Sequence, residues 1–125
     1  MPIEYTYNEE TKIIDTNAHG IVHVSEIVDY LQTILSDDQI EYGATEIFSL
    51  ENAADLIMTY SQAQIFKSLW ATYKVRIGKR ILVIAPTDKA FGLFRMLASV
   101  VEMSDEEAGN AFIVLRSRDK IIDYV

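Results

Sequence analysis

The central part of the sequence reads Arg80-Ile81-Leu82-Val83-Ile84-Ala85-Pro86-Thr87-Asp88. Its first six residues are almost continuously apolar, which is typical of a central strand covered on both faces, as parallel sheets require. Pro86 ends this strand, and an apolar helical pattern then continues from 88 to 103. The stretch therefore predicts a strand, a tight turn and a helix at the centre of an α/β domain.

Hydrophobic periodicity on both sides of this unit predicts the remaining elements. Ser25 and Ser61 are expected to cap the first two helices, because a serine hydroxyl accepts hydrogen bonds from free helix amides. The segment 51–60 is interpreted as a loop. The expected strands are 3–7, 12–18, 44–50, 80–85 and 111–115, and the expected helices are 26–36, 61–77, 88–103 and 118–124.

This order, β-β-α-β-α-β-α-β-α, fits one domain over residues 1–125. After the initial hairpin, strands and helices alternate, and right-handed crossovers then place successive strands in parallel. We therefore expect an α/β fold with a mixed, mostly parallel sheet of four or five strands and helices packed on it.

Composition excludes several classes of protein. The chain contains no cysteine, so disulfides, zinc fingers, iron–sulfur clusters and thiol nucleophiles are ruled out. A net charge of −8 argues against nucleic acid as a partner. The start of the chain lacks a basic, apolar leader, and no apolar stretch reaches the roughly 20 residues of a spanning helix. We therefore expect a cytoplasmic protein without stable membrane insertion.

Charge is unevenly distributed along the chain. Residues 1–62 carry twelve acidic side chains and one basic one, whereas residues 63–125 carry seven acidic and ten basic ones. We expect the two halves to intersperse on folding. The basic cluster over residues 74–80, which holds Lys74, Arg76, Lys79 and Arg80, is interpreted as cations at a helix C-terminus rather than as an anion site.

The sequence offers no catalytic constellation. His19 and His23 are four residues apart, but Gly20 separates them and the expected helix begins later, so no metal site is expected. The acidic runs Asp37-Asp38 and Asp105-Glu106-Glu107 follow predicted helices and are interpreted as solvated loops. We expect neither enzymatic activity nor a cofactor.

A ligand site is expected where the central strand meets its helix. Ligands of open α/β sheets favour the carboxyl ends of strands, and free amides at a helix N-terminus attract anions. Instead of binding a ligand, Thr87 or Asp88 could cap the helix. The candidate ligand-binding residues are Pro86, Thr87, Asp88, Gly92 and Arg95.

The helix predicted over 88–103 is apolar over a wider face than one-sided packing on a sheet needs. Three explanations of this surplus apolar surface stay open: packing under neighbouring helices, contact with a second subunit, or the wall of an apolar pocket. We predict a twofold homodimer through this helix. The competing account buries the same residues under the C-terminal helix of one subunit. The candidate interface residues are Phe91, Phe94, Leu97 and Val101.

Two segments, Ile84 to Met96 and Phe112 to Tyr124, resemble bacterial SpoIIAA-like proteins, which are related in fold to STAS and CRAL-TRIO domains. The resemblance implies a four- or five-stranded mixed sheet and a regulatory or binding role without catalysis. STAS-type antagonists carry a phosphorylated serine in an Asp-Ser-Ser-like turn that opens a helix. Here Leu50 to Leu56 contains no hydroxyl, and Thr59 and Ser61 come later, so the motif is absent as such.

Two functions follow from the resemblance and from the residues. The first is a non-enzymatic regulatory domain that binds a protein partner or a small ligand, for which we expect a filled core and a flat apolar patch. The alternative is a carrier of a small apolar or lipid-like ligand in a CRAL-TRIO-like pocket. That carrier would show a cavity lined by Phe91, Phe94 or Trp70.

Overall fold

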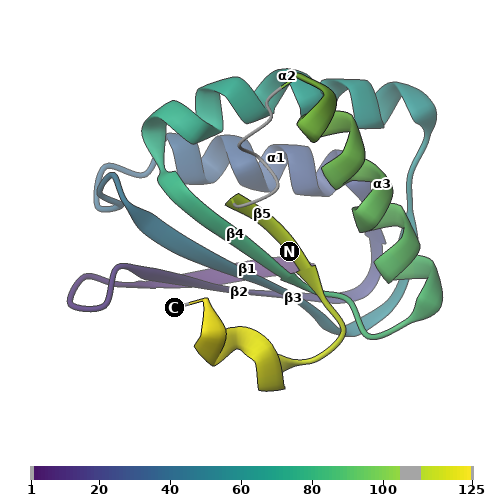
Figure 1. The fold of residues 1–125 in the computed structure, drawn as a ribbon, viewed down its shortest axis with the longest axis horizontal. Coiled ribbons are helices and arrows are strands. Elements are labelled where there is room, and N and C mark those ends of the chain that lie inside the picture. Colours follow the sequence, from purple (N-terminus) through teal and green to yellow (C-terminus); the bar gives the residue numbers. More distant parts are fainter. Residues whose placement is uncertain (1, 105–110, 125) are drawn as a thin grey trace.

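The computed structural model describes residues 2–104 and 111–124, so the acidic run Asp105-Glu106-Glu107 lies outside the described residues. Strands and helices follow one another in the predicted order (Figure 1). In chain order the elements are β1 (Ile3–Asn8), β2 (Ile13–His23), α1 (Val24–Leu35), β3 (Ala44–Ile57), α2 (Tyr60–Arg76), β4 (Gly78–Ile84), α3 (Asp88–Ser104), β5 (Phe112–Leu115) and the 3-10 helix η1 (Arg118–Asp123).

The five strands form one sheet in the order β1-β2-β3-β4-β5. β1 is antiparallel to β2, and every other pair of neighbours is parallel. β4 lies between β3 and β5, and its residues Leu82 and Ile84 are fully buried because both faces of the strand are covered. The predicted α/β fold, with a central parallel strand in a mixed sheet, is confirmed.

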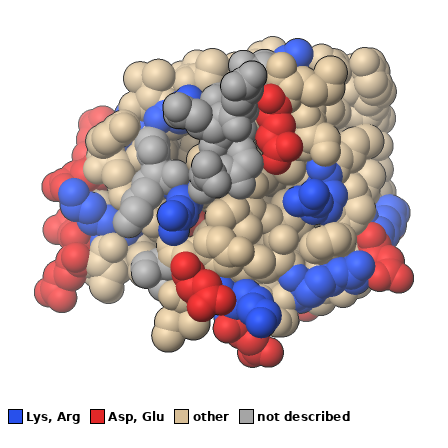
Figure 2. All heavy atoms as spheres, in the orientation of Figure 1, with Lys and Arg blue, Asp and Glu red and all other residues tan. Residues whose placement is uncertain are grey.

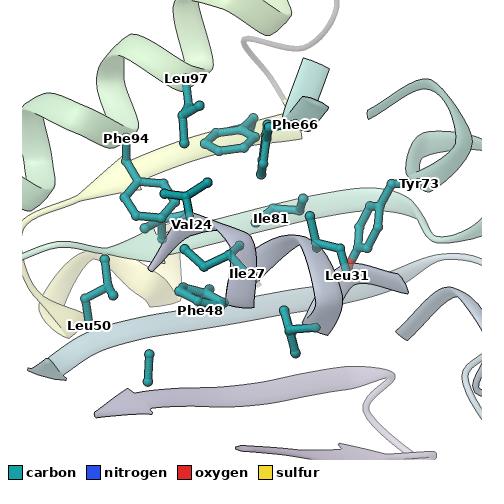
Figure 3. Packing of buried hydrophobic residues seen from close by; sticks show 14 of the residues in the cluster. Val24, Ile27, Leu31, Phe48, Leu50, Phe66, Tyr73, Ile81, Phe94 and Leu97 are labelled. Carbon is teal, nitrogen blue, oxygen red and sulfur yellow. The ribbon is translucent and has the colours of Figure 1, made fainter. Parts of the chain in front are cut away.

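The three α-helices cover one face of the sheet, and η1 lies against the other (Figure 1). Because side chains alternate along a strand, Phe48 and Leu50 of β3 join the large core under the helices (Figure 3). Ile47 of the same strand points to the opposite face, where Ile121 and Tyr124 pack against a smaller cluster. Among the described residues, no helix is long and apolar enough to cross a membrane.

Two strands are longer than the sequence predicted. The segment 51–57, interpreted as a loop, continues β3 and pairs with β2 as far as Ile57 opposite His23. Two shifts in the register interrupt this pairing, and Gly20 of β2 adopts a positive φ of 72° beside one of them. The loop prediction is wrong because pairing with β2 overrides the weak strand preference of these residues.

Two predicted helix caps are also wrong. α1 begins one residue earlier than Ser25, at Val24, after His23, whose backbone amide donates to the Glu26 carboxylate at 2.9 Å. α2 is capped by Thr59 rather than by Ser61, because the Thr59 hydroxyl accepts from the amide of Gln62 at 3.3 Å. The C-terminal helix is a 3-10 helix.

Candidate functional site

A small hollow lies at the carboxyl end of β3, next to the start of α3. We call it the strand-end hollow, and its volume is about 230 Å³. It occupies the end of the sheet at which the sequence predicted a ligand site. Most of its wall is apolar. Its lining residues are Leu50, Ala53, Ala54, Asp55, Leu56, Thr87, Lys89 and Ala90.

The hollow borders an edge of β3 that no other strand covers. β4 pairs with β3 only as far as Ile84 opposite Ser49. Beyond Ser49, β3 pairs only with β2 within the described part of the chain, so no described strand pairs with its other edge. An uncovered strand edge presents main-chain amides and carbonyls that pair readily with another chain.

The predicted turn residues act mainly within the fold. The Thr87 hydroxyl accepts from the amide of Ala90 at 3.2 Å, which is the capping role offered as an alternative. The Asp88 carboxylate pairs with Arg116 at 2.7 Å, and the Arg116 guanidinium lies 4.3 Å from the centre of the Phe91 ring. The negative charge of Asp88 in the first turn of α3 disfavours a second anion there.

The candidate ligand residues are thus only partly brought together. Thr87 lines the strand-end hollow, while Pro86 and Asp88 are exposed beside it. Gly92 and Arg95 lie further along α3 and are exposed, and neither lines the hollow. Helical spacing places them on one stripe with Asp88, but that stripe faces solvent.

Asp55 is a residue of the hollow that the sequence did not single out. Its carboxylate accepts from Lys89 at 2.7 Å and from the backbone amide of Leu56 at 2.8 Å. The Lys89 hydrogen bond, followed by the Leu56 amide, lowers the pKa of the Asp55 carboxyl below its ordinary value. The sequence does not reveal this residue, because the weak strand preference of segment 51–57 predicts a loop there.

Solved structures resemble this chain over nearly its whole length. An uncharacterised protein from Shewanella loihica PV-4, described as having a SpoIIAA-like fold, has 11% sequence identity and a TM-score of 0.53, covering 98% of this chain and 92% of its own. The anti-sigma factor antagonist SpoIIAA in its unphosphorylated form has 12% identity and a TM-score of 0.54, covering 97% and 94%. The chain has a SpoIIAA-like fold. No protein-family model and no curated protein matches the sequence.

Three of the four residues expected to form a subunit interface lie in the core of this SpoIIAA-like fold, and the fourth, Phe91, is half-buried. Phe94, Leu97 and Val101 are at most 2% exposed, and the Phe94 ring lies 6.1 Å from that of Phe48 in β3 (Figure 3). The interface prediction is wrong for these three residues, because α3 uses them to pack on the sheet. The C-terminal helix does not cover them either, since it lies on the opposite face.

A buried carboxylate, Glu46 of β3, points into the helix-covered core. It is fully buried and accepts hydrogen bonds from the hydroxyls of Tyr30 in α1 and Tyr73 in α2. The Thr16 hydroxyl lies 2.5 Å from that of Tyr30 and extends the network to β2. The cluster joins two strands and two helices, and every buried side-chain polar atom of the described residues has a partner.

The electrostatics of this cluster follow from its burial. Burial raises the pKa of the Glu46 carboxyl above its ordinary value, while the two tyrosine hydrogen bonds act in the opposite direction. Burial, followed by the charge of Glu46, raises the pKa of Tyr30 and Tyr73 well above the usual value. The hydrogen-bond network has the geometry of a structural core cluster, closed off from the strand-end hollow.

An apolar patch lies elsewhere on the surface, where the loop before β3 meets α2. Tyr42 and Val75 are 65% and 77% exposed and line a shallow hollow with Ala71, Thr72 and Arg76.

Two cations of the basic cluster donate hydrogen bonds to backbone carbonyls. Arg76 donates to the carbonyl of Asp37 at 2.9 Å, and Arg80 donates to the carbonyl of Tyr124 at 2.6 Å. Among the described residues, no group of His, Cys, Asp and Glu is arranged to hold a metal ion.

Proposed function

We propose that this chain is a non-enzymatic regulatory domain of the cytoplasm that binds a protein partner at the strand-end hollow. The observation that carries the proposal is the uncovered edge of β3 beside that hollow. An extended segment of a partner would pair with this edge through its main chain and place one apolar side chain in the hollow, which is a recurring mode of peptide recognition.

The lining of the hollow suits recognition rather than bond making. Ala53, Ala54 and Ala90 leave room for an incoming side chain, and Leu50 and Leu56 form an apolar floor. The polar groups are engaged with one another, since Asp55 holds Lys89 and Thr87 holds the start of α3. A SpoIIAA-like fold is compatible with this role, because the similar protein SpoIIAA is named as an antagonist of an anti-sigma factor.

The side chains expected to line a lipid pocket are used differently. Phe94 packs against Phe48, and Trp70 lies 5.9 Å from Phe112 between ring centres. Both rings fill the core rather than leaving a cavity. The exposed pair Tyr42 and Val75 provides the apolar patch expected of a regulator. These observations favour the regulatory proposal over the carrier.

The test is a selection of binding peptides. A random peptide library displayed on phage is selected on the wild-type protein, and the affinity of enriched peptides is measured by fluorescence anisotropy. Ala54→Arg, which fills the hollow with a charge, is expected to weaken binding at least tenfold, whereas Gln32→Arg on the exposed face of α1 leaves it unchanged. Peptides that bind both variants equally would overturn the proposal, as would a selection that enriches none.

A homodimer stays a separate prediction, and the buried face of α3 cannot provide its interface. The exposed patch around Tyr42 and Val75 is the surface we propose for it, because two exposed apolar side chains lie together there and mutual burial would remove them from water. Light scattering at tens of micromolar decides the question. A mass equal to the single-chain value of 14.2 kDa would refute the dimer.

A further inference from the structure

The face of the sheet that carries η1 is covered over only part of its width. One row of neighbouring side chains crosses this face through Thr6, Asp15, Ile47 and Leu82 of successive strands. Ile47 and Leu82 are buried in the cluster packed against η1, whereas Thr6 and Asp15 are exposed. The β1–β2 part of this face therefore has no covering element among the described residues.

A shallow, open groove of about 750 Å³ lies over this uncovered part, and we call it the sheet-face groove. One wall is formed by η1, whose Arg118 binds the Glu51 carboxylate of β3 at 2.5 Å. Asn52 donates to Asn17 across β2 and β3 at 3.2 Å. The lining residues are Glu4, Tyr5, Thr6, Asp15, Asn17, Glu51, Asn52 and Arg118.

A second hollow continues the groove toward the β1–β2 turn. The two share Thr6 and Asp15, and the second adds Glu9 and Glu10 at the turn. Acidic side chains gather on the side of the molecule where this turn lies (Figure 2). The two hollows thus form one path along the strands.

The path carries a net negative charge, because its acidic side chains outnumber its described cations. Arg118 is paired with Glu51, and the only basic residue of the hairpin, Lys12, is paired with Glu41 at 3.5 Å. No described cation forms an ion pair with Glu4 or Asp15, which face the groove. A second copy of this face and a nucleic-acid phosphate would both be repelled, so the complementary partner is cationic.

The positions of the Glu4 and Asp15 carboxylates also indicate how far apart the basic side chains of that partner should be. Thr6 is opposite Asp15 and Glu4 is opposite Asn17, so Glu4 and Asp15 are diagonal neighbours, roughly 7 Å apart. Alternate side chains of an extended chain are separated by about the same distance, twice ~3.4 Å. We propose that the sheet-face groove binds an extended segment of a partner protein with lysine or arginine at alternate positions.

The proposal is tested with two fluorescein-labelled peptides of equal composition at low ionic strength, where exposed charges act most strongly. One peptide alternates four lysines with four threonines, and the other groups the lysines in one block. Anisotropy should show tighter binding of the alternating peptide. Glu4→Gln combined with Asp15→Asn is expected to weaken it about three- to tenfold, as the loss of two exposed ion pairs implies.

A matched control separates site binding from general attraction. Asp29→Asn combined with Asp38→Asn removes the same charge from exposed positions outside the groove and is expected to leave the affinity unchanged. Equal weakening by both double variants would overturn the proposal, as would equal binding of the two peptides or no binding. Ala54→Arg at the strand-end hollow leaves this affinity unchanged, so the two proposals fail independently.

Discussion

Replacing the buried Glu46 by glutamine is expected to change how the stability of the protein depends on pH. Burial raises the pKa of this carboxyl above its ordinary value of 4.5, so the folded chain keeps a proton that the unfolded chain has already lost. Between the two pKa values the unfolded state binds fewer protons, and the free energy of unfolding therefore falls as the pH rises. The Glu46→Gln variant has no such group, so this fall disappears.

The size of the effect follows from the single proton involved. Within the window above pH 4.5 and below the raised pKa, the free energy of unfolding of the wild type changes by about 1.4 kcal/mol per pH unit relative to Glu46→Gln. Urea unfolding from pH 4.5 to 8 measures it, followed by the fluorescence of Trp70, which is the single tryptophan and is 5% exposed. A cost of refitting the amide against Tyr30 or Tyr73 shifts the whole curve and leaves the difference in slope.

Glu51 on the same strand provides the control, because its pKa is shifted in the opposite direction. Burial opposes the shift, but hydrogen bonds from Ser49 and Arg118 lower the pKa of the Glu51 carboxyl below its ordinary value. Its contribution to stability is therefore present above the ordinary pKa and is lost as the pH falls. Glu51→Gln is expected to weaken the protein at neutral pH and less in acid. Parallel pH curves for the wild type and Glu46→Gln would refute the reasoning.

Further substitutions test the packing, one helix cap and the backbone. Phe94→Ala is expected to lower the free energy of unfolding by about 3–5 kcal/mol in urea titrations, because the side chain is fully buried; a folded monomeric Phe94→Glu variant would contradict its place in the core. Thr59→Ala should lower the free energy of unfolding by about 1 kcal/mol, whereas Ser61→Ala should change it by no more than about 0.5 kcal/mol. A larger loss for Ser61→Ala in the same titrations would show that Ser61 is the cap. Gly20→Ala should lower the melting temperature, since it places a side chain at a φ of 72°, and an unchanged value would contradict the bent strand.

The central strand and the order of the elements were predictable because their signals are local. An unbroken apolar run from Ile81 to Ala85 has few interpretations, and the helices show their apolar faces at regular spacing. The extension of β3 was not predictable in the same way. Asn52 and Asp55 are poor strand formers, and pairing with β2 across two shifts of register holds them in place. Thr87 of the hollow was therefore found and Asp55 was not.

Glu46 was missed for a different reason, since a carboxylate in a strand is usually taken for a solvent-facing residue. The signal that would have found it lies in the helices. Tyr30 and Tyr73 both fall on apolar, buried faces, at the spacing of Ile27, Ile34 and their counterparts in α2. A buried tyrosine hydroxyl usually has a hydrogen-bond partner, so two of them from separate helices direct attention to acceptors on the strands beneath. A carboxylate has two oxygens and can accept from both hydroxyls, and Glu46, between Thr45 and Ile47 in the buried first half of β3, does so.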